Sequence, residues 1–248
     1  MGFNIREGEC IPGFAMGMAC KDCEHCQIAE WSALVDSELE RLDRGRRLRS
    51  FLPGEPIYHE GDASSGVYCV SDGLIGIRKV NAEGESVLLR LVRPGETFGF
   101  RSFLTETAHQ VSAEALKPTR LCLLPAKWLR PVAQANGALA QRFVGHMARD
   151  MVDLETKVLE TATASCRVRF LRLLVEFGAG EGEADGTREI DLPLSRQDIA
   201  AMIGVRSETM SRVIRAIQDE GLAEFRGRRV AIPDPARLAA ESLGDLEF

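Results

Sequence analysis

Three cysteines, Cys20, Cys23 and Cys26, lie close together near the start of the chain. Thiolates at such spacing in a reducing compartment typically bind a metal. The pattern C-x2-C-x2-C is one that iron–sulfur proteins use for three ligands of a cubane cluster. Zinc is the alternative, because structural zinc sites add a histidine or a further cysteine to such thiolates, here His25 or Cys122. The sequence therefore predicts a metal site that needs one further ligand.

Composition places this site in an ordinary globular protein of 248 residues, 45% of them hydrophobic. The charged N-terminus lacks the apolar region of a secretory signal, and no apolar run is long enough to span a membrane. We therefore expect a cytoplasmic protein with no membrane partner and reduced cysteines. The net charge of -6 means that any binding to nucleic acid must come from a local basic face. Neither a Ser/His/Asp set nor paired carboxylates indicate an enzyme.

The predicted secondary structure around the cysteines changes along the chain from an irregular segment to a helix and then to short strands. Residues 1–30 show little periodicity and form the expected cysteine-rich segment. A helical pattern over Trp31–Leu48 follows, with Asp36 or Ser37 as the cap. From Phe51 to Leu124, short apolar runs alternate with Gly and Pro turns, and Asp72-Gly73 is expected to join two of these strands. This pattern predicts an antiparallel β-roll, so residues 31–130 form the expected sensory domain.

A long helix is predicted for residues 131–163. Its apolar positions alternate at spacings of four and three, which is typical of a coiled-coil seam and predicts a homodimer. The seam consists of Ala140, Val144, Met147, Met151, Leu154, Val158 and Thr161. Asp150 and the partner's Glu155 would face each other across this seam. We expect these like charges to weaken the dimer by a few tenths of a kcal/mol per pair.

Residues 164–248 have the pattern of a winged helix-turn-helix domain. Ala200 is small where two helices would cross, Gly204 supplies the tight turn, and Met210 falls on the buried side of the second helix. Ser195 and Ser207 are the expected N-caps of the two helices. The fold class is therefore α+β: a β-roll, a long dimerisation helix and a winged helix-turn-helix domain.

The second helix of this motif carries the residues expected to read DNA. Arg212 has the geometry to pair bidentately with a guanine edge, and Glu208 to accept from an exocyclic amine. Arginines at the tip of the Ala223–Ile232 hairpin are suited to phosphates. Across residues 195–237 the chain has eight arginines and six acids, a local charge of +2. The full set of expected DNA contacts is Arg206, Glu208, Ser211, Arg212, Arg215, Arg226, Arg228 and Arg229.

In this order of domains the chain resembles the CRP/FNR superfamily of transcription regulators. The pattern Glu208-x-x-Ser211-Arg212 resembles the oxygen-sensing FNR branch. That resemblance implies a homodimer on palindromic DNA close to TTGAT-N4-ATCAA, with RNA polymerase as a further partner. It also implies a [4Fe-4S] cluster whose loss in oxygen weakens the dimer and its DNA binding.

The resemblance implies that Cys122 is the fourth ligand, beside Cys20, Cys23 and Cys26. One interval departs from the family, whose N-terminal ligands follow C-x2-C-x5-C, and Cys10 is a possible substitute. Cys69 is expected in the core and Cys166 on a helix.

Cyclic nucleotide is disfavoured as the effector. Phe100 and His109-Gln110 occupy the positions where nucleotide-binding members carry Glu and Arg-Ser. A structural zinc site and another small-molecule effector stay as alternatives. His59 and His109 are expected in loops, and His146 on the surface of the long helix.

Overall fold

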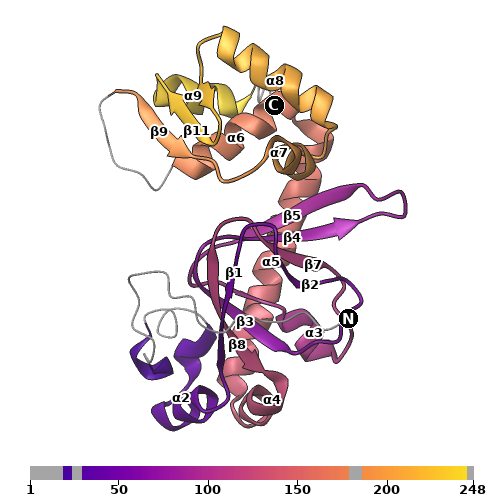
Figure 1. Ribbon diagram of the computed structural model, residues 1–248, viewed down its shortest axis with the longest axis vertical. Coiled ribbons are helices and arrows are strands. Elements are labelled where there is room, and N and C mark those ends of the chain that lie inside the picture. The colour runs from indigo at the N-terminus through magenta and orange to yellow at the C-terminus, as the bar shows by residue number, and fades with distance from the viewer. Residues whose placement is uncertain (1–18, 24–29, 179–185, 245–248) are drawn as a thin grey trace.

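The computed structural model describes residues 19–23, 30–178 and 186–244. A long helix, α5 (Gly137–Thr163), runs along the β-roll, and the C-terminal domain lies beyond its far end, as Figure 1 shows. The α+β class and the order of domains predicted from the sequence are confirmed. No helix in the described part of the chain is long and apolar enough to cross a membrane.

Short helices precede the roll. They are η1 (Cys20–Asp22), η2 (Glu30–Ala33) and α2 (Asp36–Asp43). The helix predicted to reach Leu48 ends at Asp43, and Leu48 belongs to strand β1. Its N-cap is Val35, whose backbone N–H donates to the Glu38 carboxylate at 3.0 Å, so Asp36 and Ser37 lie inside the helix and do not cap it.

The roll consists of two four-stranded antiparallel sheets. The first has the order β1 (Arg47–Phe51), β8 (Thr119–Pro125), β3 (Gly66–Asp72) and β6 (Thr97–Phe98). The second has the order β2 (Pro56–Tyr58), β7 (Ser112–Ala115), β4 (Ile75–Val80) and β5 (Ser86–Val92). At the predicted Asp72-Gly73 turn, Asp72 is the last residue of β3 and Gly73 forms a bend. Strands β3 and β4 pass into different sheets and do not form a hairpin.

Helices α3 (Phe100–Thr105) and α4 (Ala126–Ala135) complete the roll domain. The single helix expected from Pro131 is therefore two helices, with Pro131 inside α4. Asn136 separates them, because its side-chain oxygen accepts from the Leu139 backbone N–H at 3.0 Å and so caps α5. The Asn136 amide donates to the Glu38 carboxylate at 2.9 Å, which ties the start of α5 to α2.

The C-terminal domain begins with α6 (Cys166–Gly178) and β9 (Arg188–Asp191). It continues with α7 (Arg196–Ile203), α8 (Ser207–Asp219), β10 (Glu224–Arg226), β11 (Arg229–Ile232) and α9 (Pro235–Leu243). The predicted hairpin wing is β10–β11. Strand β9 pairs with β11 and extends the wing to three strands, where the sequence predicted a loop as far as Glu189.

The two halves of the chain share one hydrophobic cluster. Leu88 of β5 and Leu171 of α6 are fully buried in it, together with Ile199 of α7. Arg78 of β4 forms an ion pair with Asp198 of α7 across the same junction. The hairpin β4–β5 therefore serves as the docking surface of the roll for the C-terminal domain.

Candidate cluster-binding site and DNA-binding surface

Strand alternation places Cys122 on the outer face of the roll. Leu121 and Leu123, its neighbours in β8, lie in the interior cluster of the roll. Cys122 instead packs against a second cluster that contains Cys20 and Trp31, both buried. Because successive side chains in a strand point to opposite faces, Cys122 meets the N-terminal segment.

The thiols of this region lie close enough together to raise one another's pKa. Burial raises the pKa of the Cys122 thiol to about 12, and the nearby charges of Cys20 and Cys23 act in the same direction. Burial likewise raises the pKa of Cys69 to about 12, with further contributions from Cys122 and Cys23. Three of the four predicted ligands are thus neighbours, whereas Cys26, Cys10 and His25 lie outside the described residues. Cys69, expected as a core residue, is buried but borders this site.

A cation lies beside the thiols. The Arg46 guanidinium acts on Cys122 through both a hydrogen bond and its charge, which lower the thiol pKa against the effect of burial. Burial opposes the charge of Arg46, yet the nearby Cys20, Asp43 and Cys122 groups raise its pKa. Asp43 pairs with Arg46 at 2.5 Å and accepts from the Cys20 backbone N–H at 3.2 Å. A positive charge held in place suits thiolates that carry a metal or cluster.

The donor set fits a thiophilic metal or an iron–sulfur cluster. Within residues 19–23, 30–178 and 186–244, no three His, Cys, Asp or Glu side chains come close enough together to hold a metal ion. Among the described residues, Cys20, Cys23 and Cys122 are therefore neighbours that do not by themselves form a metal site.

A buried polar network joins the N-terminal segment to α5. His146 Nδ1 lies 2.7 Å from Glu30 Oε1, and His146 Nε2 lies 3.5 Å from Asp150 Oδ1. Thr97 donates to the other oxygen of Glu30, and Arg90 of β5 pairs with Asp150. The prediction that His146 is a surface residue is wrong, because its side chain is only 12% exposed and has two acidic partners.

The charges in this network stabilise one another. Burial disfavours the imidazolium of His146, but hydrogen bonds to Asp150 and Glu30 outweigh it and raise its pKa to about 9. Burial also disfavours the Glu30 carboxylate, but hydrogen bonds from His146 and Thr97 lower its pKa to about 2. The pair is therefore ionised at neutral pH.

Helix α5 leaves apolar side chains exposed along the predicted seam. These are Val144, Met151, Leu154 and Val158, whereas Met147 packs partly against the roll. Glu155 is exposed, but Asp150 is half-buried and paired within its own chain. Any repulsion between Asp150 and Glu155 across a dimer is therefore reduced by Arg90 and His146.

A cavity of about 380 Å³ lies between the roll and α5. Phe100, His109 and Gln110, the positions compared with nucleotide-binding proteins, line it. His109 lies in a loop as predicted, but it is buried and stacks on Tyr58 with ring centroids 3.6 Å apart. The wall also contains Asp150 and its ion-pair partner Arg90.

The helix-turn-helix has the predicted local geometry. Ser195 Oγ accepts from the Asp198 N–H at 3.0 Å, and the Asp198 carboxylate accepts from the Ser195 N–H at 2.9 Å, a reciprocal cap for α7. Gly204 has φ of 75°, the left-handed conformation that favours glycine. Met210 is fully buried. The N-cap of α8 is Arg206, so Ser207 is the first helical residue and not the predicted cap.

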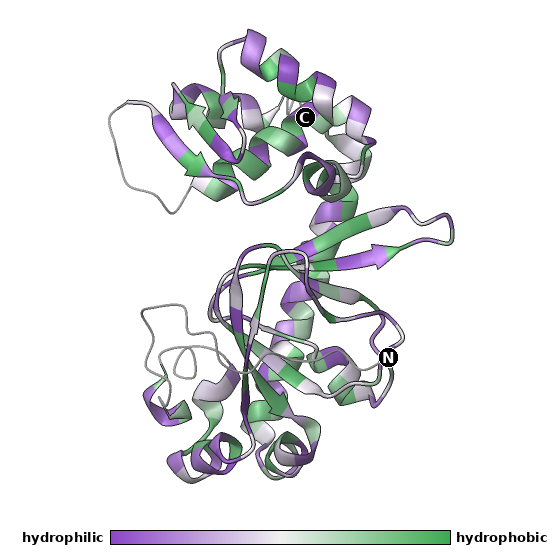
Figure 2. Ribbon diagram, viewed as in Figure 1, coloured by the Kyte–Doolittle hydropathy of each residue, from purple (hydrophilic) through white to green (hydrophobic). Residues whose placement is uncertain are grey.

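Most of the predicted DNA-reading residues, on α8 and the wing, are exposed. Along α8 hydrophilic and hydrophobic positions alternate (Figure 2). The exposed members of the set are Arg206, Glu208, Arg212, Arg215, Arg226, Arg228 and Arg229. Ser211 is half-buried and donates to the Ser207 carbonyl at 2.9 Å, so its hydroxyl already has a partner.

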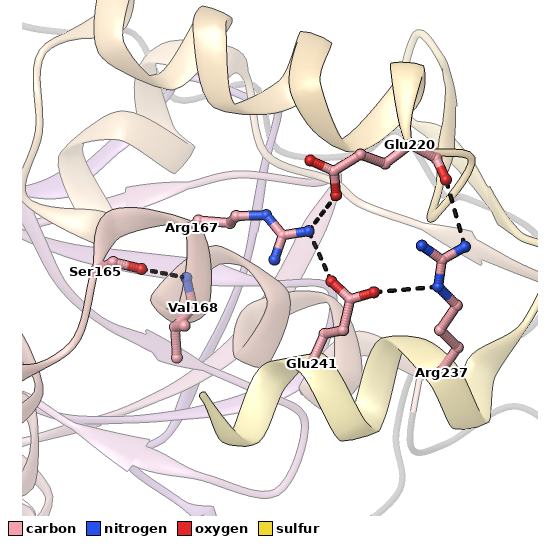
Figure 3. A network of polar contacts seen from close by, with 6 residues as sticks. All are labelled: Ser165, Arg167, Val168, Glu220, Arg237 and Glu241. Atoms are coloured by element: carbon pink, nitrogen blue, oxygen red, sulfur yellow. Dashed lines mark hydrogen bonds and ion pairs between the residues drawn. The ribbon is translucent and has the colours of Figure 1, made fainter. Parts of the chain in front are cut away.

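An ionic network fixes α8 against the helices behind it (Figure 3). Arg167 of α6 pairs with Glu241 of α9 at 2.7 Å and also with Glu220, the C-cap of α8. Arg237 of α9 pairs with Glu241 at 3.1 Å and donates to the Glu220 carbonyl at 3.4 Å. Sequence reasoning missed α9 and this network, because the partners lie far apart along the chain.

Comparisons with known proteins agree with this architecture. Residues 48–136 match the family model of the cyclic nucleotide-binding domain, and residues 168–241 match that of the Crp-like helix-turn-helix domain. The chain is 28% identical over 233 residues to the transcriptional activator protein anr of Pseudomonas aeruginosa, covering 92% of this chain and 94% of the relative. It is 30% identical over 194 residues to the nitrogen fixation regulation protein FixK of Rhizobium meliloti, covering 78% and 86%.

Among solved structures, a transcriptional regulator of the CRP/FNR family from Eubacterium rectale has the same fold. Its TM-score is 0.72 at 20% identity, and the match covers 86% of this chain and 97% of that one. The domain matches, the FixK relative and the fold together establish that the chain belongs to the CRP/FNR family of transcription regulators.

Proposed function

We propose that this regulator responds to oxygen through a [4Fe-4S] cluster held by Cys20, Cys23, Cys26 and Cys122. The observation that carries the proposal is the position of Cys122. It lies on the outer face of the roll, near Cys20 and Cys23 and beside the Arg46 cation. A cluster bound to four thiolates is anionic, so a fixed guanidinium stabilises it. When bound, the cluster would supply the redox chemistry of the sensor, because its iron and sulfide react with oxygen.

The active form that we propose is a homodimer joined through α5. Val144, Met151, Leu154 and Val158 are exposed in a single chain and follow a coiled-coil spacing. Each apolar side chain buried in such a seam contributes roughly 1.5–3 kcal/mol at full burial. The two-fold axis of the dimer would present two copies of α8 to a palindrome such as TTGAT-N4-ATCAA, with half-sites about one helical turn apart.

The Glu30–His146 pair would carry the signal from the cysteines to the dimer helix. Glu30 follows the cysteine segment, and His146 lies on α5 one turn before Asp150. A shift of the N-terminal segment would separate a buried carboxylate from its imidazolium. His146 would then keep Asp150, four residues along α5, as its acidic partner.

DNA recognition would use Glu208, Ser211 and Arg212 for base edges, with Arg206 and Arg215 beside them. Arg226, Arg228 and Arg229 of the wing would contact phosphates. The resemblance to the FNR branch adds RNA polymerase as a partner and the cytoplasm as the location.

Anaerobic purification tests the cluster. The proposal expects a brown protein that contains iron and sulfide and bleaches in air. Cys20→Ser, Cys23→Ser, Cys26→Ser and Cys122→Ser should each lose the colour, and Cys166→Ser is the matched control that should keep it. If the protein is colourless and contains zinc, the cysteines form a structural zinc site and the cluster proposal is wrong.

A second candidate is a regulator with a small-molecule effector, which the cavity of about 380 Å³ in the roll favours. If Cys122→Ser binds DNA as wild type does, both with and without air, the small-molecule effector replaces the cluster as the proposed signal.

A further inference from the structure

Cys69 and Cys122 lie directly opposite each other in the first sheet of the roll. Strands β3 and β8 are antiparallel, and these two residues are paired in their register. Opposite residues in antiparallel strands have Cα atoms about 4.5–5.5 Å apart. Disulfides need Cα separations of about 4.4–6.8 Å. The backbone therefore already holds the two cysteines at a separation that a disulfide accepts.

The two thiols also share a face. Tyr68 and Val70 flank Cys69 and lie in the interior of the roll. Cys69 therefore points outward, as Cys122 does. Of the five cysteines in the described part of the chain, these two belong to strands, and both are free thiols.

The N-terminal segment covers this pair. Cys20 and Trp31 belong to the cluster against which Cys122 packs. The Trp31 indole N–H is buried, and its interaction with Cys69 lowers the pKa of that thiol, in opposition to burial. Cys69 is 6% exposed. An oxidant would reach the pair only after the cover moves.

We propose that Cys69 and Cys122 form a cross-strand disulfide when Cys122 holds no metal and the N-terminal segment is displaced. The oxidant is a peroxide. One thiolate attacks a peroxide oxygen, which gives a sulfenic acid and one water. The second thiolate attacks that sulfur, and the disulfide forms with release of a second water. Two thiols thus lose two electrons and two protons to one peroxide.

The disulfide would remove Cys122 from the ligand set until a dithiol reduces it. This consequence rests on the proposed cluster, whereas formation of the bond does not. The disulfide would persist after exposure to the oxidant and would delay reassembly of the cluster until it is reduced.

The test uses the full chain without metal, with a chelator present and one equivalent of hydrogen peroxide. Intact mass should fall by two hydrogen atoms. A non-reduced digest should contain a peptide pair that joins Cys69 to Cys122, and a dithiol should remove it. Cys166→Ser should give the same pair, and Cys69→Ser should not. Mapping of the wild type alone suffices if Cys69→Ser fails to fold.

Cluster reconstitution is the second measurement. After peroxide, reconstitution should fall several-fold in wild type, stay unchanged in Cys69→Ser, and return with the dithiol. The inference is overturned if Cys122 stays reduced, or if it pairs with Cys20 or Cys23. If untreated protein accepts no cluster but the Cys69–Cys122 pair forms, the proposed function fails while the disulfide stands.

Discussion

Glu30 and His146 are joined by a contact of 2.7 Å between Oε1 and Nδ1, although 116 positions separate them in the chain. One follows the cysteine segment and the other lies in the middle of the helix with the exposed apolar seam. Both are largely buried, so Glu30 depends on His146 for a partner of opposite charge, while His146 also has Asp150. Their contact joins the N-terminal segment to the helix that carries the exposed apolar side chains.

The pH dependence of stability should reveal this pair. The pKa of His146 is raised to about 9 from 6.5, so its stabilising contribution is complete below about pH 6.5 and is lost as pH rises through about 9. The pKa of Glu30 is lowered to about 2 from 4.5, so its contribution is complete above about pH 4.5 and is lost as pH falls through about 2.

His146→Gln should therefore lower the unfolding free energy by roughly 1–3 kcal/mol near pH 6 and by much less near pH 10. Urea unfolding at both pH values measures this difference. His59→Gln, at an exposed loop position, is the matched control and should change neither value. An equal loss at both pH values would mean that His146 contributes packing and no charge.

Asp150 and Glu155 should respond differently to loss of charge. We expect Asp150→Ala to raise the dimer fraction and DNA binding in air, because it removes one acid from the seam. The same change should lower the stability of the single chain by roughly 1–3 kcal/mol, since Arg90 and His146 lose a half-buried partner.

Glu155→Gln removes an exposed charge and should raise the dimer fraction without that loss of stability. Sedimentation and thermal unfolding of both variants separate the two effects. An unchanged sedimentation profile for both would show that the seam is assigned wrongly.

The apolar seam itself can be tested at Val158, which is 70% exposed. Val158→Glu should raise the dimer dissociation constant at least tenfold, because a charge would be buried in the interface. The fold of the single chain should not change. Val152→Glu is the matched control, since Val152 is 58% exposed on the same helix but lies off the seam. Comparable loss of dimer in both variants would contradict the predicted spacing.

Arg212 and Arg226 should differ in what they contribute to DNA binding. Arg212→Ala should cost about 1–3 kcal/mol on the palindrome and relax the preference at one base pair. Arg226→Ala should weaken binding to all sequences alike and reduce the salt dependence by about one unit of slope. Titrations with the palindrome and with single-base variants at several salt concentrations measure both. If Arg226→Ala changed the preference at particular base pairs, the wing would contact base edges in a groove and not only phosphates.

The helix-turn-helix was predictable because its determinants are local. Ser195 caps α7 through a residue three positions away, and Gly204 sets the turn by its own φ. The break at Asn136 was local too, since Asn before Gly137 is a cap signal, yet the apolar spacing favoured one continuous helix.

The contacts that matter most for the site could not be predicted this way. The burial of His146 depends on Glu30, and the closeness of Cys69 to Cys122 depends on the pairing of β3 with β8. Strand register is set by the packing of the whole roll, so the sequence alone left Cys69 as a core residue.

The register of β8 also fixes the direction in which Cys122, a ligand of the proposed cluster, points. A slip of one residue would turn Cys122 inward and expose Leu121 and Leu123, so the hydrophobic interior of the roll holds the thiol outward. In the proposed site, Cys122 would therefore be the rigidly held ligand, and the N-terminal cysteines would close upon it. Binding affinity and kinetics should accordingly be limited by the N-terminal segment, which makes that segment the place where variation in sensitivity can arise without changes to the roll.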